Sequence, residues 1–201
     1  QLNIFEIEGI FSNAHINALE GHIEEYEYTD DDLLILQYSS QEGSAESIAE
    51  LNSLLSGYDF PIGVWFGPYK ISIDFKQLNN FDYIGFSPGL EINNVSFDES
   101  VEKKYCTINI CNFEERKIIV STNEGIYDNY LIVGTLGSFI ENIDFVISDQ
   151  SIEFFKPSLF ERFYIAISNP IFTYMFFVLG FALIGLEPVS YTHLRAHETS
   201  E

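Results

Sequence analysis

The sequence predicts an α/β fold built on a largely parallel sheet, followed by a membrane-spanning helix. Apolar runs alternate with amphipathic stretches along most of the chain, in the order of βαβ crossovers. Two of these runs, Ile62–Phe66 and Tyr83–Phe86, are continuously apolar, as are strands buried on both faces of a sheet. Further along, the 24 residues Phe163–Leu186 carry no charge and are long enough to cross a bilayer.

The first strand and helix are predicted at the amino end. Residues 3–10 alternate apolar and polar side chains, which is typical of a half-buried strand. Ser12 or Asn13 is expected to cap a helix that runs to about Glu25, because its apolar residues recur at helical spacing.

A βαβ crossover follows. Leu33–Gln37 is predicted to be a buried strand, Tyr38–Ser44 a polar loop, and Ala45–Ser56 an amphipathic helix. The next strand, Ile62–Phe66, ends at Gly67-Pro68, where the chain must turn because proline cannot donate to a sheet ladder. Open α/β sheets bind ligands at the carboxyl ends of their strands, so we expect a functional site at this edge.

Beyond the turn that follows Phe86, the pattern predicts shorter elements. Residues 93–104 are polar and acidic, and Tyr105–Asn112 alternates like an edge strand. Ile118–Ser121 is predicted to be a short strand, and residues 145–155 to be a terminal strand or a linker.

Composition divides the chain into four parts. We expect one domain over residues 1–150, a linker over 151–162 and a transmembrane helix over 163–187. The last segment, 188–201, reads PVSYTHLRAHETSE and breaks abruptly from the apolar stretch before it. It resembles a translated sequencing adapter, so it is interpreted as a non-native tail and excluded from the fold.

The charge balance excludes some classes of partner. The chain has 9 basic and 31 acidic residues, a formal net charge of −22. Nucleic-acid affinity comes from lysine and arginine neutralising phosphates, so a nucleic-acid partner is not expected. The same balance disfavours docking on anionic lipid through basic patches. Most of the acidity is interpreted as a solvated surface.

One segment carries a resemblance to a known family. The residues from Pro61 to Gly89 read PIGVWFGP, then a polar loop and helix, then FDYIGFSPG. This order resembles the NfeD family of membrane-bound ClpP-class serine proteases, also called stomatin operon partner proteins. The stretch from Gly125 to Asp144 and the apolar segment after it also resemble the family.

The resemblance implies a fold, a location and partners. The fold would be a ClpP/crotonase-like domain built from ββα and βαβ units and followed by a transmembrane helix. The domain would lie outside the cytoplasm, held at the cell membrane by the helix over 163–187, which would cross the lipid bilayer as the first helix of a truncated membrane region. Its partner would be a stomatin-like membrane protein, with a homo-oligomer as a further arrangement, and no cofactor is implied.

The catalytic serine of the family motif is not matched here. Its position falls near Phe75, and the nearest hydroxyl, Ser72, is expected to be an ordinary turn or helix-cap hydroxyl. The family's general base is a lysine later in the chain, and by order only Lys103 and Lys104 match it. Lys70 lies two residues from Ser72, on a different face if the segment is helical.

The family's oxyanion-binding loop is also altered. It corresponds to about Ser39 through Gly43, with Ser39, Ser40, Gly43 and Gly67 as the candidate donors. Glu42 would bring a negative charge to the place where the oxyanion develops, which would raise the barrier.

Three functions remain open on the sequence. The first is an inactive protease-like domain that acts as a binding or scaffold partner. The alternative is an active membrane-bound serine endopeptidase with a relocated Ser/Lys dyad. Acyl-CoA chemistry, as in crotonases, would rest on the fold alone, since no nucleotide-phosphate loop is visible.

The cysteines and histidines are expected to be structural. Cys106 and Cys111 are interpreted as semi-buried thiols, because a disulfide at this spacing would need a turn between them. A disulfide is the alternative if the domain faces an oxidising compartment. His15 and His22 share a helix face that is interpreted as solvated. His193 and His197 have metal-like spacing, but they lie in the tail. No metal site is predicted.

Overall fold

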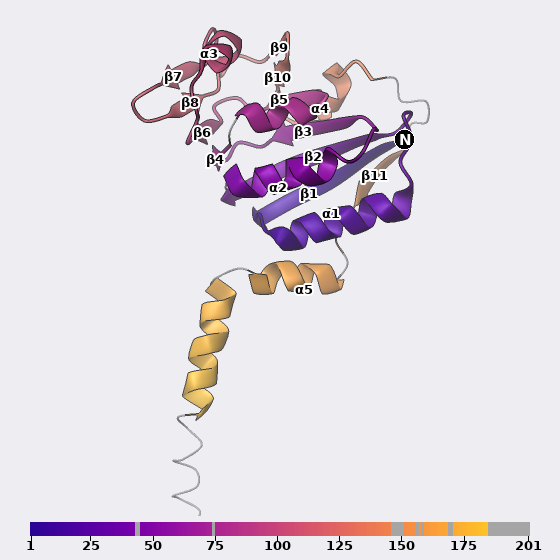
Figure 1. Cartoon of the computed structure of the whole chain (residues 1–201), viewed down its shortest axis with the longest axis vertical. Helices are drawn as coiled ribbons and strands as arrows, with labels where there is room; N and C mark the ends of the chain where they lie inside the picture. The colour runs from indigo at the N-terminus through magenta and orange to yellow at the C-terminus, as the bar shows by residue number, and fades with distance from the viewer. Residues whose placement is uncertain are drawn as a thin grey trace, which may run out of the picture. The chain divides into compact units, whose positions relative to one another are not determined.

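The computed structural model describes residues 1–42, 45–73, 75–145, 151–155, 157, 159–168 and 171–184. Its chain forms two compact units, Gln1–Pro157 and Ser158–Glu201. The first unit contains all of the described strands, and the second contains helices (Figure 1).

The first unit alternates strands and helices in its amino-terminal half. Its elements there are β1 (Leu2–Ile10), α1 (Asn13–Tyr26), β2 (Leu33–Glu42), α2 (Ala45–Leu55), β3 (Ile62–Phe66), β4 (Ile71–Ser72), the 3₁₀ helix η1 (Phe75–Asn80) and β5 (Tyr83–Phe86). The remaining elements are β6 (Glu91–Asn93), α3 (Glu99–Tyr105), β7 (Ile110–Asn112), β8 (Lys117–Ile119), β9 (Gly125–Tyr127), β10 (Tyr130–Ile132), α4 (Leu136–Asn142) and β11 (Ile152–Phe155).

The strands form two sheets. The main sheet has the order β11-β1-β2-β3-β5-β10-β9, and every neighbouring pair is parallel except β10 with β9. A smaller sheet has the order β4-β6-β8-β7. The main sheet confirms the predicted α/β class, because parallel neighbours require crossover connections.

Helices cover both faces of the main sheet, and alternate residues of each strand supply two cores. Leu34 and Leu36 of β2 pack in the cluster that includes Leu19 of α1 and Leu51 of α2. Leu33 and Ile35 point to the other face, where they share a cluster with Phe139 of α4. Figure 1 shows α1 and α2 on one face of the sheet. The predicted amino-terminal helices are therefore confirmed.

Strands β3 and β5 have the predicted bounds, but three nearby predictions are wrong. The polar loop expected from Tyr38 is instead strand as far as Glu42, because β2 stays paired with β1. The helix expected after Gly67 is the short strand β4 and then η1. Most of the edge strand predicted over Tyr105–Asn112 is replaced by the end of α3 and a turn.

Helix α3 lies in the polar and acidic stretch 93–104, and its start is stabilised by its N-cap residue, Asp98. Asp98 accepts hydrogen bonds from the backbone N–H groups of Ser100 and Val101, at 3.1 and 3.0 Å. The bond from Val101, the hydroxyl of Ser100 and the ammonium of Lys76 together lower the pKa of Asp98 to about 2. The side chain thereby satisfies amide donors that a helix start otherwise leaves unpaired.

The two cysteines form a disulfide, so the prediction of free thiols is wrong. Cys106 ends α3 and Cys111 lies in β7, with Cα atoms 5.6 Å apart. The turn between these elements brings together side chains that a straight strand would point to opposite faces.

Strand β11 lies where residues 145–155 were predicted to be a terminal strand or a linker, so the strand is confirmed and the linker boundary at residue 151 is wrong. It pairs in parallel with β1, and Phe155 stacks on Phe5 with ring centroids 5.5 Å apart. The compact unit consequently extends to Pro157.

The second unit contains α5 (Leu159–Ser168) and a helix over Ile171–Ile184. Among the described residues, neither helix alone has the length and apolarity to span a bilayer. The two meet that requirement only together, as a pair bent by 76°. The single spanning helix predicted over 163–187 is therefore not confirmed. The predicted tail, 188–201, lies outside the described residues.

Candidate functional site at the carboxyl edge of the sheet

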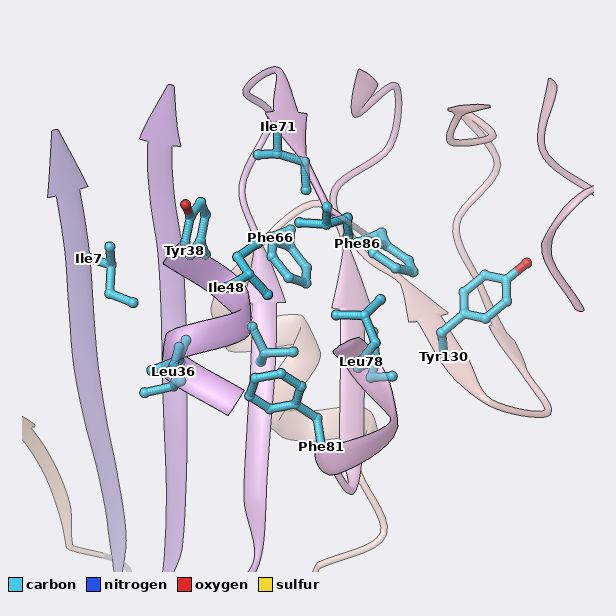
Figure 2. Packing of buried hydrophobic residues seen from close by; sticks show 14 of the residues in the cluster. Ile7, Leu36, Tyr38, Ile48, Phe66, Ile71, Leu78, Phe81, Phe86 and Tyr130 are labelled. Carbon is cyan, nitrogen blue, oxygen red and sulfur yellow. The ribbon is translucent and has the colours of Figure 1, made fainter. Parts of the chain in front are cut away.

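An aromatic row occupies the carboxyl ends of the central strands. Tyr38, Phe66 and Phe86 are register partners on β2, β3 and β5, and each is at most 1% exposed. The ring centroids of Tyr38 and Phe66 lie 5.4 Å apart, and those of Phe66 and Phe86 lie 5.7 Å apart (Figure 2). This is the edge where an open α/β sheet places its ligands, and in this protein it is filled by side chains.

The position expected for a nucleophile belongs to the same core. Phe75, the first residue of η1, is 3% exposed, and its ring lies 4.1 Å from that of Tyr105 at the end of α3. Tyr105 in turn packs on Tyr130 of β10, at 5.2 Å. Burial raises the pKa of Tyr105, so this phenol stays neutral.

Ser72 lies in β4, so the expectation of a turn or helix-cap hydroxyl is wrong. Its hydroxyl accepts a hydrogen bond from the Nδ2 group of Asn94, at 2.7 Å. The neighbouring Lys70 is ion-paired with Glu91, at 3.1 Å, and is largely exposed. In the described part of the chain, the serine thus has an amide as its partner and no lysine at hydrogen-bonding distance.

Lys103 and Lys104 lie in the last turn of α3 and line a pocket that does not include Ser72. The ammonium of Lys104 sits 5.2 Å from the ring centre of Tyr105, and partial burial lowers its pKa. The structure therefore places Lys104 beside the Tyr105 ring, which packs on Phe75 at the position expected for the nucleophile.

The two oxyanion candidates that the structure describes, Gly67 and Ser39, do not form a donor pair. The N–H of Gly67 donates to the carbonyl of Tyr38 at 2.9 Å, as part of the sheet. The hydroxyl of Ser39 accepts from the side-chain amide of Gln37, at 3.4 Å. Gly43 and the side chain of Ser40 lie outside what the structure describes.

The packing of Phe75 with the aromatic row was not predicted from the sequence. Phe66, Phe86 and Phe75 are far apart along the chain, and each had an ordinary explanation as a core residue. The available signal was the high aromatic content, 16% of residues, together with the phenylalanine that ends each of the two continuous apolar runs, Ile62–Phe66 and Tyr83–Phe86.

The histidines also differ from expectation, since neither lies on a solvated face. His15 is 3% exposed, its Nε2 bonds to the carbonyl of Glu8 at 3.1 Å, and its Nδ1 accepts from the N–H of Ser12 at 3.3 Å. His22 stacks on Phe155, with ring centroids 4.0 Å apart. Among the described residues, no three His, Cys, Asp or Glu side chains are grouped to hold a metal.

The burial of His15 predicts a pH effect on stability. Burial lowers its pKa below 6.5 in the folded state, whereas the unfolded chain keeps about the usual value. The unfolded state therefore binds the proton first, and folding stability falls as the pH drops below about 6.5. Thermal unfolding followed between pH 8 and pH 5 should show this loss, and His15→Gln should flatten it. An equal slope in the variant would contradict the assignment.

The fold has a counterpart among solved structures. A 1510-N membrane-bound stomatin-specific protease, a lysine-to-alanine mutant in complex with a substrate peptide, is similar to this chain with a TM-score of 0.53. The similarity covers 84% of this chain and 97% of that one, at 8% sequence identity. The chain has a ClpP-class protease-like fold.

A second structure of that protease, a serine-to-alanine mutant, has a TM-score of 0.49 at 9% identity, covering 78% of this chain and 98% of that one. No protein-family model and no curated protein sequence matches this chain. The similarity to the first of these structures confirms the predicted ClpP-class α/β fold.

Proposed function

We propose that residues 1–157 form a membrane-associated, NfeD-type protease-like domain that has lost proteolysis and acts by binding a partner. The observation that carries this proposal is the Phe75–Tyr105 pair, 4.1 Å between ring centres, at the edge where the resemblance implies a serine and a lysine. A nucleophilic serine needs a base within hydrogen-bonding distance and donors for the oxyanion. The rings exclude both a nucleophile and the water or peptide that would reach it.

The alternative is an active serine endopeptidase with a relocated dyad. The lowered pKa of Lys104 favours it, because a general base must lose its proton near neutral pH. However, the hydroxyl of Ser72 is hydrogen-bonded to the side chain of Asn94, and Lys70 forms an ion pair with Glu91. A dyad would require these contacts to break, so we favour the inactive domain.

Fluorophosphonate labelling of the full chain in detergent micelles tests the choice. We expect no labelling above that of heat-denatured protein, and no difference between wild type, Ser72→Ala and the double variant Ser39→Ala/Ser40→Ala. An active serine hydrolase in the same detergent is the positive control. Labelling that disappears in one variant would identify a working nucleophile and establish the endopeptidase.

The proposed partner is a stomatin-like membrane protein. The protease of similar fold is described as stomatin-specific, and the sequence resemblance implies the same association. An extracytoplasmic location fits the Cys106–Cys111 disulfide, because disulfides persist in oxidising compartments. An inactive domain would keep the recognition of such a partner without cutting it.

The second unit supplies the proposed membrane attachment. On α5, Leu159, Phe160, Phe163 and Tyr164 are 60–83% exposed, so its apolar side is not covered. Helix Ile171–Ile184 has no charged residue, and its exposed aromatic and aliphatic side chains lie all around it. We propose that α5 lies in the interface plane and that the following helix enters the hydrocarbon.

Membrane attachment through the second unit predicts that residues 1–160 and the full chain differ in their need for detergent. Residues 1–160 alone should be monodisperse in plain buffer, because that length contains the complete compact unit. The full chain should aggregate without detergent and should float with phosphatidylcholine vesicles in a density gradient. A control with Phe172, Phe176 and Phe177 changed to Asp should stay at the bottom. Full-length protein that remains monodisperse without detergent would remove the membrane assignment.

A further inference from the structure

A pocket of about 510 Å³ lies between the end of α3 and the β9–β10 hairpin. Lys103 and Lys104 of α3 and Ile108 of the turn after it form one wall. Ile126 and Tyr127 of β9 border the opposite side, and Asp128 lies at the hairpin turn. Nothing in the proposed binding role has yet used this pocket.

The pocket lies against the end of the β9–β10 hairpin, where it is lined by Ile126 and Tyr127 and then by Asp128, Asn129 and Tyr130. Successive side chains of a strand point to opposite faces of the sheet, so those of Ile126 and Tyr127 cannot both point into one pocket on a face. The pocket therefore meets the main chain of β9 as well as its side chains. Strand β9 is the last strand of its sheet in the described residues, so no described strand covers its outer edge.

The hydrogen-bond pattern of β10 shows which backbone groups face the pocket. Val133 donates its N–H to the carbonyl of Phe86, at 3.0 Å, so the alternate residue Leu131 also faces β5, where it pairs with Gly85. Tyr130 and Ile132 therefore bond to β9, and their register partners are Tyr127 and Gly125.

Ile126 is the residue of β9 between these two bonded partners. In an antiparallel pair, the residue between two bonded positions points its N–H and C=O away from the partner strand. Its backbone donor and acceptor thus point away from β10, and the same residue lines the pocket. Unpaired groups of this kind at a sheet edge are a template for an added strand.

The charges of the pocket select the side chains of such a strand. Lys103 and Lys104 are two of only 9 basic residues in a chain that has 31 acidic ones. Lysines in the last turn of a helix also stabilise its dipole, so they do not by themselves indicate a ligand. Here, however, they line the same pocket as Ile126, and the one acidic residue among the described lining residues is Asp128 at the hairpin turn, so cations outnumber anions in the pocket.

The wall opposite β9 is held in shape before any ligand arrives. The Cys106–Cys111 disulfide closes the turn that carries Ile108, whose side chain is 39% exposed. A wall fixed in this way loses little conformational entropy when it binds, which favours affinity.

We propose that this pocket binds an extended peptide segment bearing a carboxylate, which adds to β9 through the backbone of Ile126 and places its acidic side chain against Lys103 and Lys104. The contact joins strand addition to charge recognition. It holds whether or not the domain hydrolyses peptides, because the pocket does not include Ser72 or Phe75.

The test uses the full chain in detergent micelles and a fluorescein-labelled peptide, Thr-Glu-Val-Glu-Val-Thr. We expect saturable binding by fluorescence anisotropy. The peptide with lysine in place of glutamate should bind at least about tenfold more weakly, because the charge-assisted bonds are lost. No saturation of the acidic peptide up to millimolar concentration would overturn the proposal.

Two pairs of variants separate the two parts of the contact. Ile126→Pro removes the outward N–H and leaves the bonds to β10 intact, whereas Ile126→Ala keeps the N–H. The proline should weaken binding roughly tenfold and the alanine less than about threefold. Lys103→Gln/Lys104→Gln should weaken binding similarly, and the exposed Lys70→Gln should not.

N-methylation of the first valine of the peptide, which lies between its two glutamates, tests the backbone bonds without altering the protein. Weaker binding of this peptide is expected even if Ile126→Pro disturbs the hairpin. Binding that ignores both N-methylation and the lysine variants would overturn the proposal. Fluorophosphonate labelling of the same samples reports separately on catalysis, so the two proposals can fail independently.

Discussion

Phe75→Ser is expected to destabilise the protein by about 3–5 kcal/mol and to create no hydrolase. The substitution places a serine where the resemblance expects the nucleophile. The side chain is 3% exposed and packs on Tyr105, so its loss leaves a cavity and buries a hydroxyl among aromatic rings. The melting temperature should fall by roughly 10 °C, measured by the fluorescence of the single tryptophan.

The matched control for this variant is Phe113→Ser. Phe113 is 53% exposed, so its replacement should change the free energy of unfolding by no more than about 1 kcal/mol. Fluorophosphonate labelling of a folded Phe75→Ser protein would contradict the expectation. It would mean that the remaining site can activate a serine once the ring is removed.

The second large effect is expected at Gly85. A Cβ atom added there would lie 2.5 Å from the ring of Phe139 and 2.8 Å from that of Trp65. Phe139 is fully buried, and Trp65 is held by a hydrogen bond from its Nε1 to the carbonyl of Val133, at 3.2 Å. Neither ring can move without opening the core beneath α4, so Gly85→Ala should cost about 3 kcal/mol.

Gly21→Ala is the control for Gly85→Ala. Gly21 lies within α1, and an added Cβ would meet nothing within 4 Å. Alanine is favoured over glycine inside a helix, so this variant should be more stable by about 0.5–1 kcal/mol. Urea unfolding monitored at Trp65 measures both. Equal stability of Gly85→Ala and wild type would show that α4 packs less closely than the structure indicates.

The continuous apolar runs were predicted with correct bounds because their burial has only one interpretation. Ile62–Phe66 is buried at every residue, and a strand covered on both faces must be apolar throughout. The amphipathic spacing of α1 and α2 identified them for the same reason. The local spacing of apolar residues predicts secondary structure where one face of an element, or both, must be buried.

Other elements were left open or missed because distant residues form them. For residues 145–155 the sequence offered a terminal strand or a linker, and only the pairing of β11 with β1, across the whole domain in sequence, decides for the strand. The disulfide required the turn after α3, and the burial of His15 required the carbonyl of Glu8. None of these partners is visible in the local pattern.

The sequence by itself determined the α/β class, the central strands and the absence of a serine at the position expected for the nucleophile. These follow from short-range periodicity and from the identity of single residues. Only the tertiary structure decided what surrounds Phe75, since the Phe75–Tyr105 pair joins two segments separated by strands β5 and β6. It also decided which backbone edge is open to the proposed peptide, because the edge at Ile126 exists only once β9 has become the last described strand of the sheet.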